Sequence, residues 1–504
     1  MKSETKRRLC FWAILALGIG IRLWRFGAVP EGINQDEAFA GYEAFCLLRD
    51  GMDTAGYRFP VYLTAWGSGM NALESYLMLP FLAVFGLKTW VIRLPQLLTG
   101  LLSLPAMYGA VRRMRSETQA LLTMLLLAIC PWHVLLSRWA LESNLAPGFL
   151  LFGLYFFLRA LEDGRFFWLS GLFYGLSLYA YATVWPFVPL MLALMLGLCA
   201  FRRKLRFSLH LLGGGALLTL LALPLLLFLA VNFGWIGEIR TAFFSVPKLL
   251  YMRSGELSFR NIPENLQNLC SILWTQSDGL PWNSAGAFGL LYPLSAPFVL
   301  LGLLSCAERR VRGRACDPAS PMLSQLLAAL LLGLLVKVNV NRVNILFPPL
   351  VFLAGEGICW FCGRFRLRLL PLVTAAYLLC FGLFARYYFT DYRELLRPSF
   401  AWGLEEALEA AQSEDELVLS GDVYYPDVLF YTHLEPARFR ETVRYQNYPA
   451  AFLRAASFDR YRFESENGMG EEPCYLLSAW NDGTFLEERG YTAERFGYYT
   501  LYRK

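Results

Sequence analysis

Long apolar runs dominate this chain and restrict what it can fold into. Of its 504 residues, 56% are hydrophobic and only 17% are charged. A helix that spans a bilayer needs about 20 mainly apolar residues, and segments of that kind recur along most of the sequence. They predict a polytopic α-helical membrane protein with about eleven transmembrane helices. The predicted spans are 9–27, 90–111, 118–136, 145–160, 166–184, 186–201, 207–231, 290–307, 322–340, 343–361 and 369–386.

Basic residues gather in the short loops at one end of these spans. Six such loops carry 20 of the 46 Lys and Arg residues, and with eleven spans all six fall on the same side. The positive-inside rule makes that side cytoplasmic. We therefore expect a multi-pass protein of the plasma membrane with its N-terminus inside and its C-terminus outside. The larger loops at about 28–89 and 232–289 are then extracytoplasmic.

The last part of the chain has a different character. Residues 390–504 contain 21 acidic and 12 basic residues, although the whole chain carries a net charge of +6. A helical pattern at 400–412 and strand patterns at 416–422, 473–479 and 496–502 predict a soluble α/β domain. The expected organisation is a transmembrane module at 1–389 followed by an extracytoplasmic α/β domain at 390–504.

The acidic pair Asp36-Glu37 follows the first predicted span directly. Charge near hydrocarbon is costly unless it is solvated, paired or used, so the pair predicts a chemical site at the membrane face; ordinary interfacial acids are the alternative. An adjacent like charge is expected to raise one pKa of the pair. Glu142 lies in a second segment on the same predicted side, and it could instead pair with Arg138 at i,i+4 spacing.

Basic residues on the predicted outer side require an explanation, because Lys and Arg are otherwise concentrated on the cytoplasmic side. Arg138, Arg240 and Arg342 come from three different outer segments, and we expect such residues to bind the phosphate of a membrane lipid. A surface neutralised by nearby acids, or a polar turn between helices, is the alternative.

Several classes of chemistry are disfavoured. The chain has no phosphate-binding glycine loop, no dinucleotide fingerprint and no zinc spacing, and its three His residues cannot form a multi-histidine site. No nucleic-acid partner is expected. A divalent metal stays open as a cofactor, with Asp36 and Glu142 as its candidate ligands. The remaining carboxylates and arginines suit displacement at a sugar carbon, with a carboxylate base and cations on a phosphate leaving group.

Four features together resemble glycosyltransferase family 39, over about residues 1–390. This family includes protein O-mannosyltransferases and lipid A aminoarabinose transferases, which share the membrane C-type glycosyltransferase fold. The features are Asp36-Glu37 after the first span, Ser-Arg-Trp-Ala-Leu-Glu-Ser-Asn at 137–144, Ser-Asp-Gly-Leu-Pro-Trp-Asn at 277–283 and Asn-Arg-Val-Asn-Ile-Leu-Phe-Pro-Pro-Leu at 341–350.

The resemblance implies use of a polyprenyl-phosphate sugar at the outer face of the membrane. Asp36 matches the family's general base, and Glu142 matches the region that supplies a second acid. One departure is the Lys-Pro-Pro-type segment of aminoarabinose transferases, which is absent here; residues 67–76 read Gly-Ser-Gly-Met-Asn-Ala-Leu-Glu-Ser-Tyr. The phosphate site must therefore be built differently.

The sequence thus predicts an inverting glycosyltransferase that moves a sugar from a polyprenyl-phosphate donor to an acceptor of the cell envelope, whether glycan, lipid or protein. Asp36 would deprotonate the acceptor hydroxyl, with Glu37 and Glu142 orienting the substrates. A transporter or flippase of lipid-linked sugars is the alternative and predicts charges inside the spans and inverted repeats. A binding or scaffold protein that works through its tail is a third hypothesis.

Overall fold

The chain divides into two compact units, which are described separately. The computed structural model describes residues 2–201, 207–252, 258–312, 317–365, 369–464 and 472–504, so the predicted basic loop at 202–206 lies outside the described residues. The helical unit comprises residues 1–26, 96–223 and 254–392, and the sheet unit comprises residues 27–95, 224–253 and 393–504.

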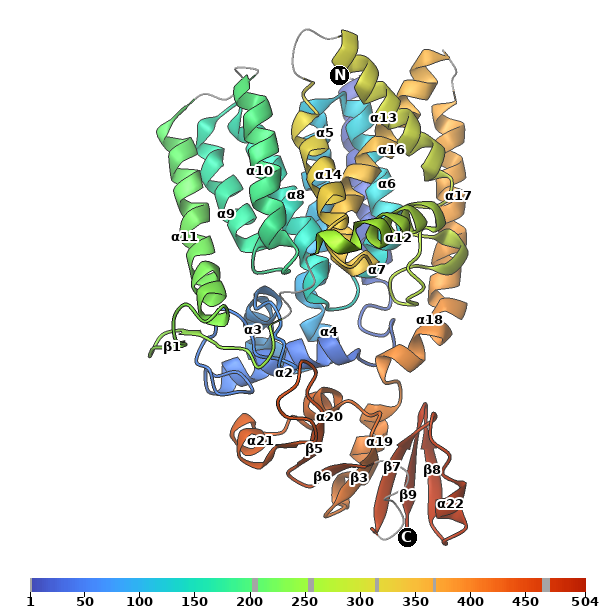
Figure 1. Cartoon of the computed structure of the whole chain (residues 1–504). Coiled ribbons are helices and arrows are strands. Elements are labelled where there is room, and N and C mark those ends of the chain that lie inside the picture. The colour runs from blue at the N-terminus through green and yellow to red at the C-terminus, as the bar shows by residue number, and fades with distance from the viewer. Residues whose placement is uncertain (1, 202–206, 253–257, 313–316, 366–368, 465–471) are drawn as a thin grey trace. The chain divides into compact units, whose positions relative to one another are not determined.

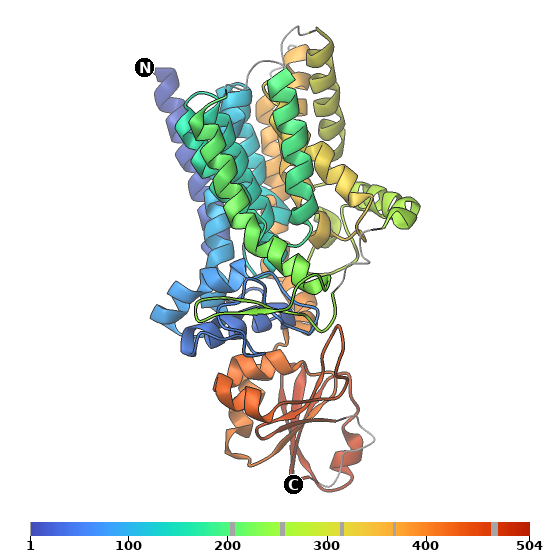
Figure 2. The ribbon, with the colours of Figure 1, turned by 60° about the vertical axis from the view of Figure 1, so that its left-hand side comes forward.

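Long helices run side by side through the helical unit (Figures 1 and 2). Each of the eleven predicted spans overlaps one or more helices of the full set, which also includes shorter and crossing helices. The helices are α1 (Lys2–Leu23), α5 (Leu94–Met114), α6 (Glu117–Ile129), α7 (Pro131–Leu136), α8 (Glu142–Ala160), α9 (Phe167–Ser177), α10 (Val184–Phe201), α11 (Leu209–Asn232), α12 (Ile262–Thr275), α13 (Ser295–Arg312), α14 (Ser320–Gly333), α15 (Val340–Val343), α16 (Phe347–Arg364) and α17 (Leu370–Phe389).

Five stretches of helix, among the described residues, are long and apolar enough to cross a membrane. The multi-pass architecture is therefore confirmed, whereas the number eleven stays a prediction. Some predicted spans are broken by local chemistry: 118–136 is divided at Cys130, because Pro131 has no backbone N–H to continue α6. The five stretches are Thr89–Met114, Val184–Phe201, Leu209–Asn232, Val340–Arg364 and Leu370–Phe389.

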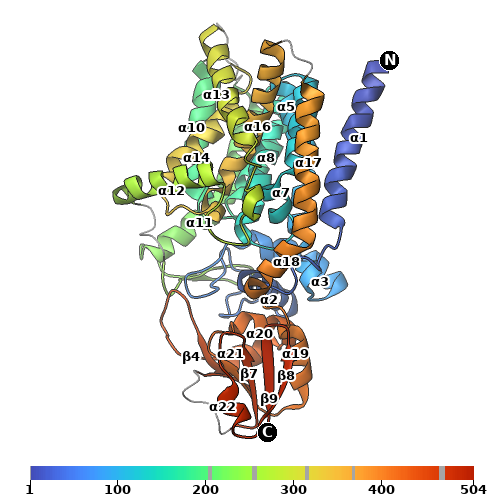
Figure 3. The ribbon, with the colours of Figure 1, turned by 90° about the vertical axis from the view of Figure 1, so that its right-hand side faces the viewer.

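Helix α12 runs across the long helices instead of along them (Figure 3). The sequence did not predict it, because residues 262–275 were included in an outer loop. Its apolar residues fall on one side, where Leu269 and Ile272 are buried, whereas Trp274 is exposed. Such an amphipathic helix is typical of a chain segment that lies at the surface of a helix bundle.

The sheet unit is built around a seven-stranded mixed sheet, coloured orange to red in Figure 2. Its order is β4-β5-β6-β3-β7-β9-β8, and the central strand β3 pairs in parallel with both β6 and β7. The α/β class predicted for residues 390–504 is confirmed. The strands are β3 (Leu417–Ser420), β4 (Arg444–Tyr445), β5 (Ala455–Phe458), β6 (Tyr461–Glu464), β7 (Cys474–Ser478), β8 (Thr492–Phe496) and β9 (Tyr499–Arg503).

Helices and a small ladder complete the sheet unit. The predicted helix at 400–412 is shorter, because α19 begins after Gly403, which has a positive φ. The other helices of the tail have no counterpart in the prediction. The elements are α2 (Gln35–Arg49), α3 (Leu73–Phe85), α4 (Thr89–Ile92), α18 (Asp391–Leu396), α19 (Leu404–Ala410), α20 (Tyr425–Thr432), α21 (Pro436–Thr442), α22 (Thr484–Glu487), and the antiparallel strands β1 (Ile239–Arg240) and β2 (Ser245–Val246).

The sheet unit combines the tail of the chain with two earlier segments. The predicted domain boundary at 389/390 lies close to residue 393, where the last segment of the unit begins. The unit also includes residues 27–95 and 224–253, which come from the two loops predicted to be outside the membrane. The tail and these loops are therefore one compact body.

Candidate functional site

Asp36 is held at the first turn of α2. The side chain of Asn34 caps the helix by accepting a hydrogen bond from the Asp36 backbone N at 3.1 Å, and Glu37 accepts one from the Asn34 backbone N at 3.0 Å. This reciprocal arrangement is a capping box. The cap fixes the backbone of Asp36, whose side chain is half-buried. A carboxylate at a helix N-terminus is also favoured by the helix dipole.

Glu37, predicted as a catalytic residue, forms a fully buried ion pair with Arg93. The Nε and Nη2 atoms of Arg93 lie 2.7 and 2.8 Å from the two carboxylate oxygens of Glu37, and both side chains are 0% exposed. Arg93 also donates to the carbonyl oxygens of Pro30 and Gly32 at 2.9 and 2.8 Å. These contacts give Glu37 the role of positioning the turn that carries Asp36.

The segment before Asp36, residues 31–34, contacts residues 397–400 at the start of the C-terminal tail. Gly32 has a φ of +78°, and a Cβ there would lie 1.9 Å from the carbonyl oxygen of Phe400, so only glycine fits. The Asn34 amide donates to the Ser399 carbonyl at 2.9 Å. Glu31 forms an ion pair with Arg397 at 2.6 Å. Asp36 is therefore attached to a rigid frame of distant segments.

A second acid, Asp427, lies beside Asp36 in the sheet unit. Asp427 is in α20, which packs against α2, and its Oδ1 is buried without a hydrogen-bond partner among the described residues. Burial raises the pKa of Asp427 well above its usual range, and the charges of Asp36 and Glu37 raise it further. Burial and these neighbouring charges therefore favour the neutral form of Asp427.

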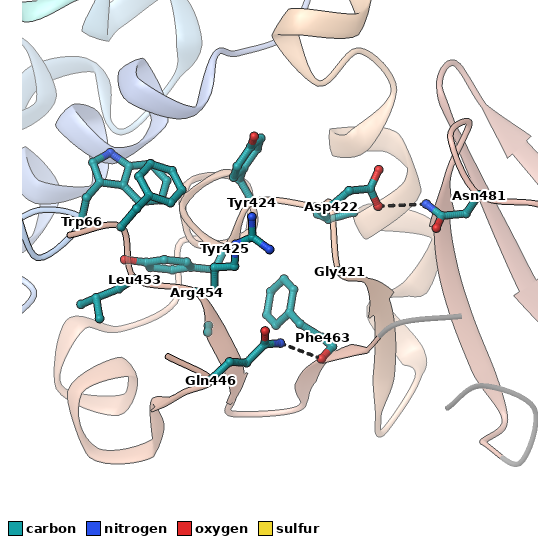
Figure 4. A pocket seen from close by; sticks show the side chains of 13 residues that line it. Trp66, Gly421, Asp422, Tyr424, Tyr425, Gln446, Leu453, Arg454, Phe463 and Asn481 are labelled. Carbon is teal, nitrogen blue, oxygen red and sulfur yellow. Dashed lines mark hydrogen bonds between the residues drawn. The ribbon is translucent and has the colours of Figure 1, made fainter. Parts of the chain in front are cut away.

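A cavity of about 650 Å³ lies in the sheet unit (Figure 4). Its lining combines aromatic and polar side chains from three parts of the chain. Tyr424 connects it to Asp36: burial raises the pKa of Tyr424, and the nearby carboxyl groups of Asp427 and Asp36 contribute. The lining includes Trp66, Asp422, Tyr424, Tyr425, Gln446, Phe452, Arg454 and Asn481.

Glu142 lies in the helical unit, as the first residue of α8, and is half-buried. Two of the resembling motifs meet next to it, because the Asn344 amide donates to the Ser143 carbonyl at 2.6 Å. Within the described ranges, Ser143 Oγ, Asn144 Nδ2 and Asn344 Oδ1 are buried without a partner. Buried polar atoms of this kind are suited to a water molecule or a polar ligand.

The third motif joins the same region through Asp278. Its Oδ2 accepts hydrogen bonds from Asn283 at 2.8 Å and from the backbone N of Val340 at 2.9 Å. Val340 begins α15, the short helix that carries Arg342. Motifs more than 130 residues apart in the sequence are therefore neighbours in the fold.

The three arginines predicted to bind phosphate have different surroundings. Arg138 is fully buried, and all five of its N–H groups donate: to the hydroxyl of Tyr388 and to four carbonyl oxygens in residues 21–25, at 2.6–3.1 Å. It holds the end of α1, and a phosphate contact would require one of these bonds to break. Arg240 is half-exposed and pairs with Glu238 at 3.0 Å. Arg342 is half-buried and donates to the Lys337 carbonyl at 3.3 Å.

The predicted site residues fall in two groups. Asp36, Glu37 and Arg240 belong to the sheet unit, and Glu142, Arg138 and Arg342 belong to the helical unit. No group of three or more His, Cys, Asp or Glu residues within the described parts of the chain could hold a metal ion. A divalent metal with Asp36 and Glu142 as ligands stays a prediction.

Sequence reasoning missed Arg93 and Asp427. Arg93 was counted within the apolar segment 90–111, where a lone arginine is itself a signal of a buried partner. Asp427 had no comparable signal, because it follows Tyr424-Tyr425-Pro426 in what reads as an ordinary helix start.

Comparisons with known proteins bear on the family and the fold of this chain. The family described as dolichyl-phosphate-mannose-protein mannosyltransferase matches residues 73–228 of this chain. The predicted resemblance to glycosyltransferase family 39 is thereby confirmed. No curated protein matches the chain.

Solved structures match almost the whole chain. ArnT from Cupriavidus metallidurans in the apo state has a TM-score of 0.59 at 14% identity, covering 99% of this chain and 98% of that one. The same protein bound to undecaprenyl phosphate gives a TM-score of 0.58, also at 14% identity and with the same coverage. The oligosaccharyltransferase AglB from Archaeoglobus fulgidus, in complex with an inhibitory peptide and a dolichol-phosphate, has a TM-score of 0.50 at 15% identity, covering 86% of this chain and 64% of that one.

The fold and the family match together define the class. The protein is a multi-pass membrane glycosyltransferase with the C-type fold. Within that class it is similar to ArnT along nearly its full length.

Proposed function

We propose that the protein transfers a sugar from a polyprenyl-phosphate donor to an acceptor hydroxyl at the extracytoplasmic face, with inversion at the anomeric carbon. Asp36 is the general base. It takes the proton of the acceptor hydroxyl as the acceptor oxygen bonds to the anomeric carbon, and the carbon–oxygen bond to phosphate breaks with its electron pair on the leaving polyprenyl phosphate. Positioned base catalysis of this kind contributes about 10²–10⁴-fold in rate.

The position of Asp36 is the observation that carries this proposal. Its backbone is fixed by the cap from Asn34 and by the buried Glu37–Arg93 pair, yet its side chain stays half-exposed. Only a carboxylate that solvent or substrate can reach serves as a base, whereas Glu37 is fully buried. A rigid frame around an accessible acid is what proton transfer at a fixed point requires.

The lipid donor is proposed from the neighbouring folds, since ArnT has been solved with undecaprenyl phosphate and AglB with a dolichol-phosphate. Arg342 is our first candidate for the donor phosphate, because Arg240 is balanced by Glu238 and Arg138 holds α1. Glu142 lies beside the buried polar atoms of the helical unit and orients the sugar. The orientation follows the basic loops: N-terminus in the cytoplasm, sheet unit outside.

The substitution Asp36→Asn tests the base. Asparagine keeps the size of the side chain but accepts no proton, so we expect turnover to fall about 10²–10⁴-fold with little change in donor affinity. The measurement is transfer from a short-chain polyprenyl-phosphate sugar by the purified protein. Glu43→Gln, the same chemical change in the middle of α2, is the matched control and should keep its turnover. A turnover rate of Asp36→Asn close to that of the wild type would overturn the assignment of Asp36 as the general base.

A further inference from the structure

The cavity of the sheet unit lies where parallel strands end. Strand β3 pairs in parallel with β6 and β7, so the carboxyl ends of these three strands share one edge of the sheet. Gly421 and Asp422 follow β3, Asn481 follows β7, and Phe463 is near the end of β6. Crevices at the carboxyl ends of parallel strands are the usual ligand sites of α/β sheets.

The polar groups of the cavity are held in place before any ligand arrives. Asp422 accepts hydrogen bonds from the Asn481 amide at 2.9 Å and from the Ser478 hydroxyl, and Gln446 donates to the Phe463 carbonyl at 3.2 Å; Figure 4 shows the Asn481 and Gln446 bonds. The Arg454 guanidinium forms no ion pair within the described part of the chain, and its residue is exposed. Acceptors and donors therefore both remain for a ligand.

Aromatic rings form the rest of the lining. Trp66 stacks on Phe452 with ring centroids 4.2 Å apart and an interplanar angle of 11°, and Tyr424 is 42% exposed. A sugar ring has an apolar C–H face that packs on aromatic rings, which carry a negative π-face, and its hydroxyls both donate and accept. Aromatic faces flanked by carboxylate, amide and guanidinium groups match both features of a saccharide.

The aromatic wall also connects the cavity to the base. Phe39 lies three residues after Asp36, so both point to one side of α2. Its ring contacts Trp66 and Tyr425 edge-on, with centroids 4.9 and 5.7 Å apart. Asp36 is not part of the lining, but its charge acts on Tyr424. A ligand in the cavity would thus be next to the base and not on it.

We propose that this cavity binds a saccharide unit of the acceptor, so that the acceptor is a glycan whose non-reacting sugar is held here while another of its hydroxyls reaches Asp36. This inference rests on the proposed transferase function and specifies its acceptor. Binding energy from the non-reacting unit is used to orient the reacting hydroxyl.

The test measures saccharide binding apart from transfer. The full chain in detergent is titrated with a panel of short oligosaccharides, neutral and uronate-containing, and with a Ser/Thr-rich peptide, using saturation-transfer NMR. At least one oligosaccharide should bind. Tyr424→Ala and Arg454→Ala should each raise its Kd about tenfold, as expected for loss of one stacking or charge-assisted contact. Tyr424→Phe keeps the ring and should bind nearly as the wild type.

Two controls separate this inference from the proposed function. Arg495→Ala removes an exposed arginine from β8, at the opposite edge of the sheet, and should leave binding unchanged. Asp36→Asn should keep saccharide binding even when transfer is lost. If saccharide binding persists but neither the wild type nor any variant transfers sugar, the proposed transferase function is overturned and the saccharide site is not. Binding of the peptide only, no binding by any oligosaccharide, or binding that Tyr424→Ala and Arg454→Ala leave intact would overturn the glycan site.

Discussion

Two neighbouring carboxyl groups of the sheet unit are placed in opposite environments. Asp36 is half-exposed at the start of α2, whereas Asp427 is buried with a raised pKa. Environment divides such pairs into a charged and a neutral member. Burial therefore favours the neutral form of Asp427, whereas Asp36, the proposed base, stays accessible.

The substitution Asp427→Asn tests this division of roles. An amide and a protonated carboxyl are both neutral and nearly the same shape, so we expect turnover at pH 7 to stay within about threefold of the wild type, far from the 10²–10⁴-fold loss of a base. The measurement is the transfer rate of Asp427→Asn beside Asp36→Asn. If Asp427→Asn lost as much activity as Asp36→Asn, the two carboxyl groups would share the proton.

Arg93 and Glu37 form a buried ion pair that fixes the turn carrying Asp36, the proposed base. Removing one partner of a buried ion pair costs about 3–5 kcal/mol of stability, so Glu37→Ala and Arg93→Ala should both unfold at clearly lower temperature. Arg93→Lys keeps the charge but loses the two-pronged contact, and we expect a stable protein with reduced kcat and unchanged donor KM. Thermal unfolding and steady-state kinetics measure the two effects. An Arg93→Lys variant with full kcat would show that the position of α2 does not depend on the two-pronged contact between Arg93 and Glu37.

At the scale of elements, α2 shows how much the sequence could have revealed. Its first turn reads Asn34-Gln-Asp-Glu37, which has the Asn-x-x-Glu spacing of a capping box, so the helix could have been predicted. The Glu37–Arg93 contact could not, because it joins residues 56 positions apart. The membrane spans could be predicted because the length of an apolar run is a local property of the sequence. The cavity could not, because it depends on the order of strands that are distant in the sequence.

The middle of α2 carries a second buried acid whose titration should be visible in stability. Glu43 accepts two hydrogen bonds from Thr54 and lies near buried Asp53 and Arg440. Burial raises the pKa of Glu43, and the charge of Asp53 raises it further. The folded protein then binds the proton more tightly than the unfolded chain, whose Glu pKa is about 4.3. The contribution of Glu43 to the free energy of unfolding is therefore greatest below the unfolded pKa of about 4.3. It falls as the pH rises toward the raised pKa of Glu43 in the folded protein.

Glu43→Gln removes this titration while keeping the side-chain shape. We expect the apparent melting temperature of the wild type in detergent to fall more between pH 5 and pH 8 than that of the variant. Asp415→Asn, at an exposed site between α19 and β3, is the control and should follow the wild-type curve. Parallel curves for wild type and Glu43→Gln would mean that Glu43 is ionised throughout this range.

At the scale of the whole molecule, charge divides the chain. Residues 28–72 and 390–504 both carry excess negative charge, while basic residues gather in the short loops between spans. The first two stretches contribute to one compact unit. One charged arrangement was underestimated from the sequence: Glu356 lies inside a predicted span, where it pairs with Arg115 at 2.6 Å. Arg115 also pairs with Asp317 at 2.6 Å, so this acid joins helices and requires no transport role.

The orientation of the molecule follows from the same charges and can be tested at three positions. Ala55, in the first outer loop, and Ser413, in the tail, are exposed in the sheet unit, and Thr5 is exposed near the start of α1. The background replaces Cys10 and Cys270, the two exposed cysteines of the described residues, with Ser. In intact cells a membrane-impermeant maleimide should modify cysteines placed at Ala55 and Ser413, because the proposed orientation puts the sheet unit outside. A cysteine at Thr5 should react only after permeabilisation, since the basic N-terminus stays in the cytoplasm. Labelling of Thr5→Cys in intact cells would reverse the topology and place Asp36 on the side opposite the proposed site of transfer.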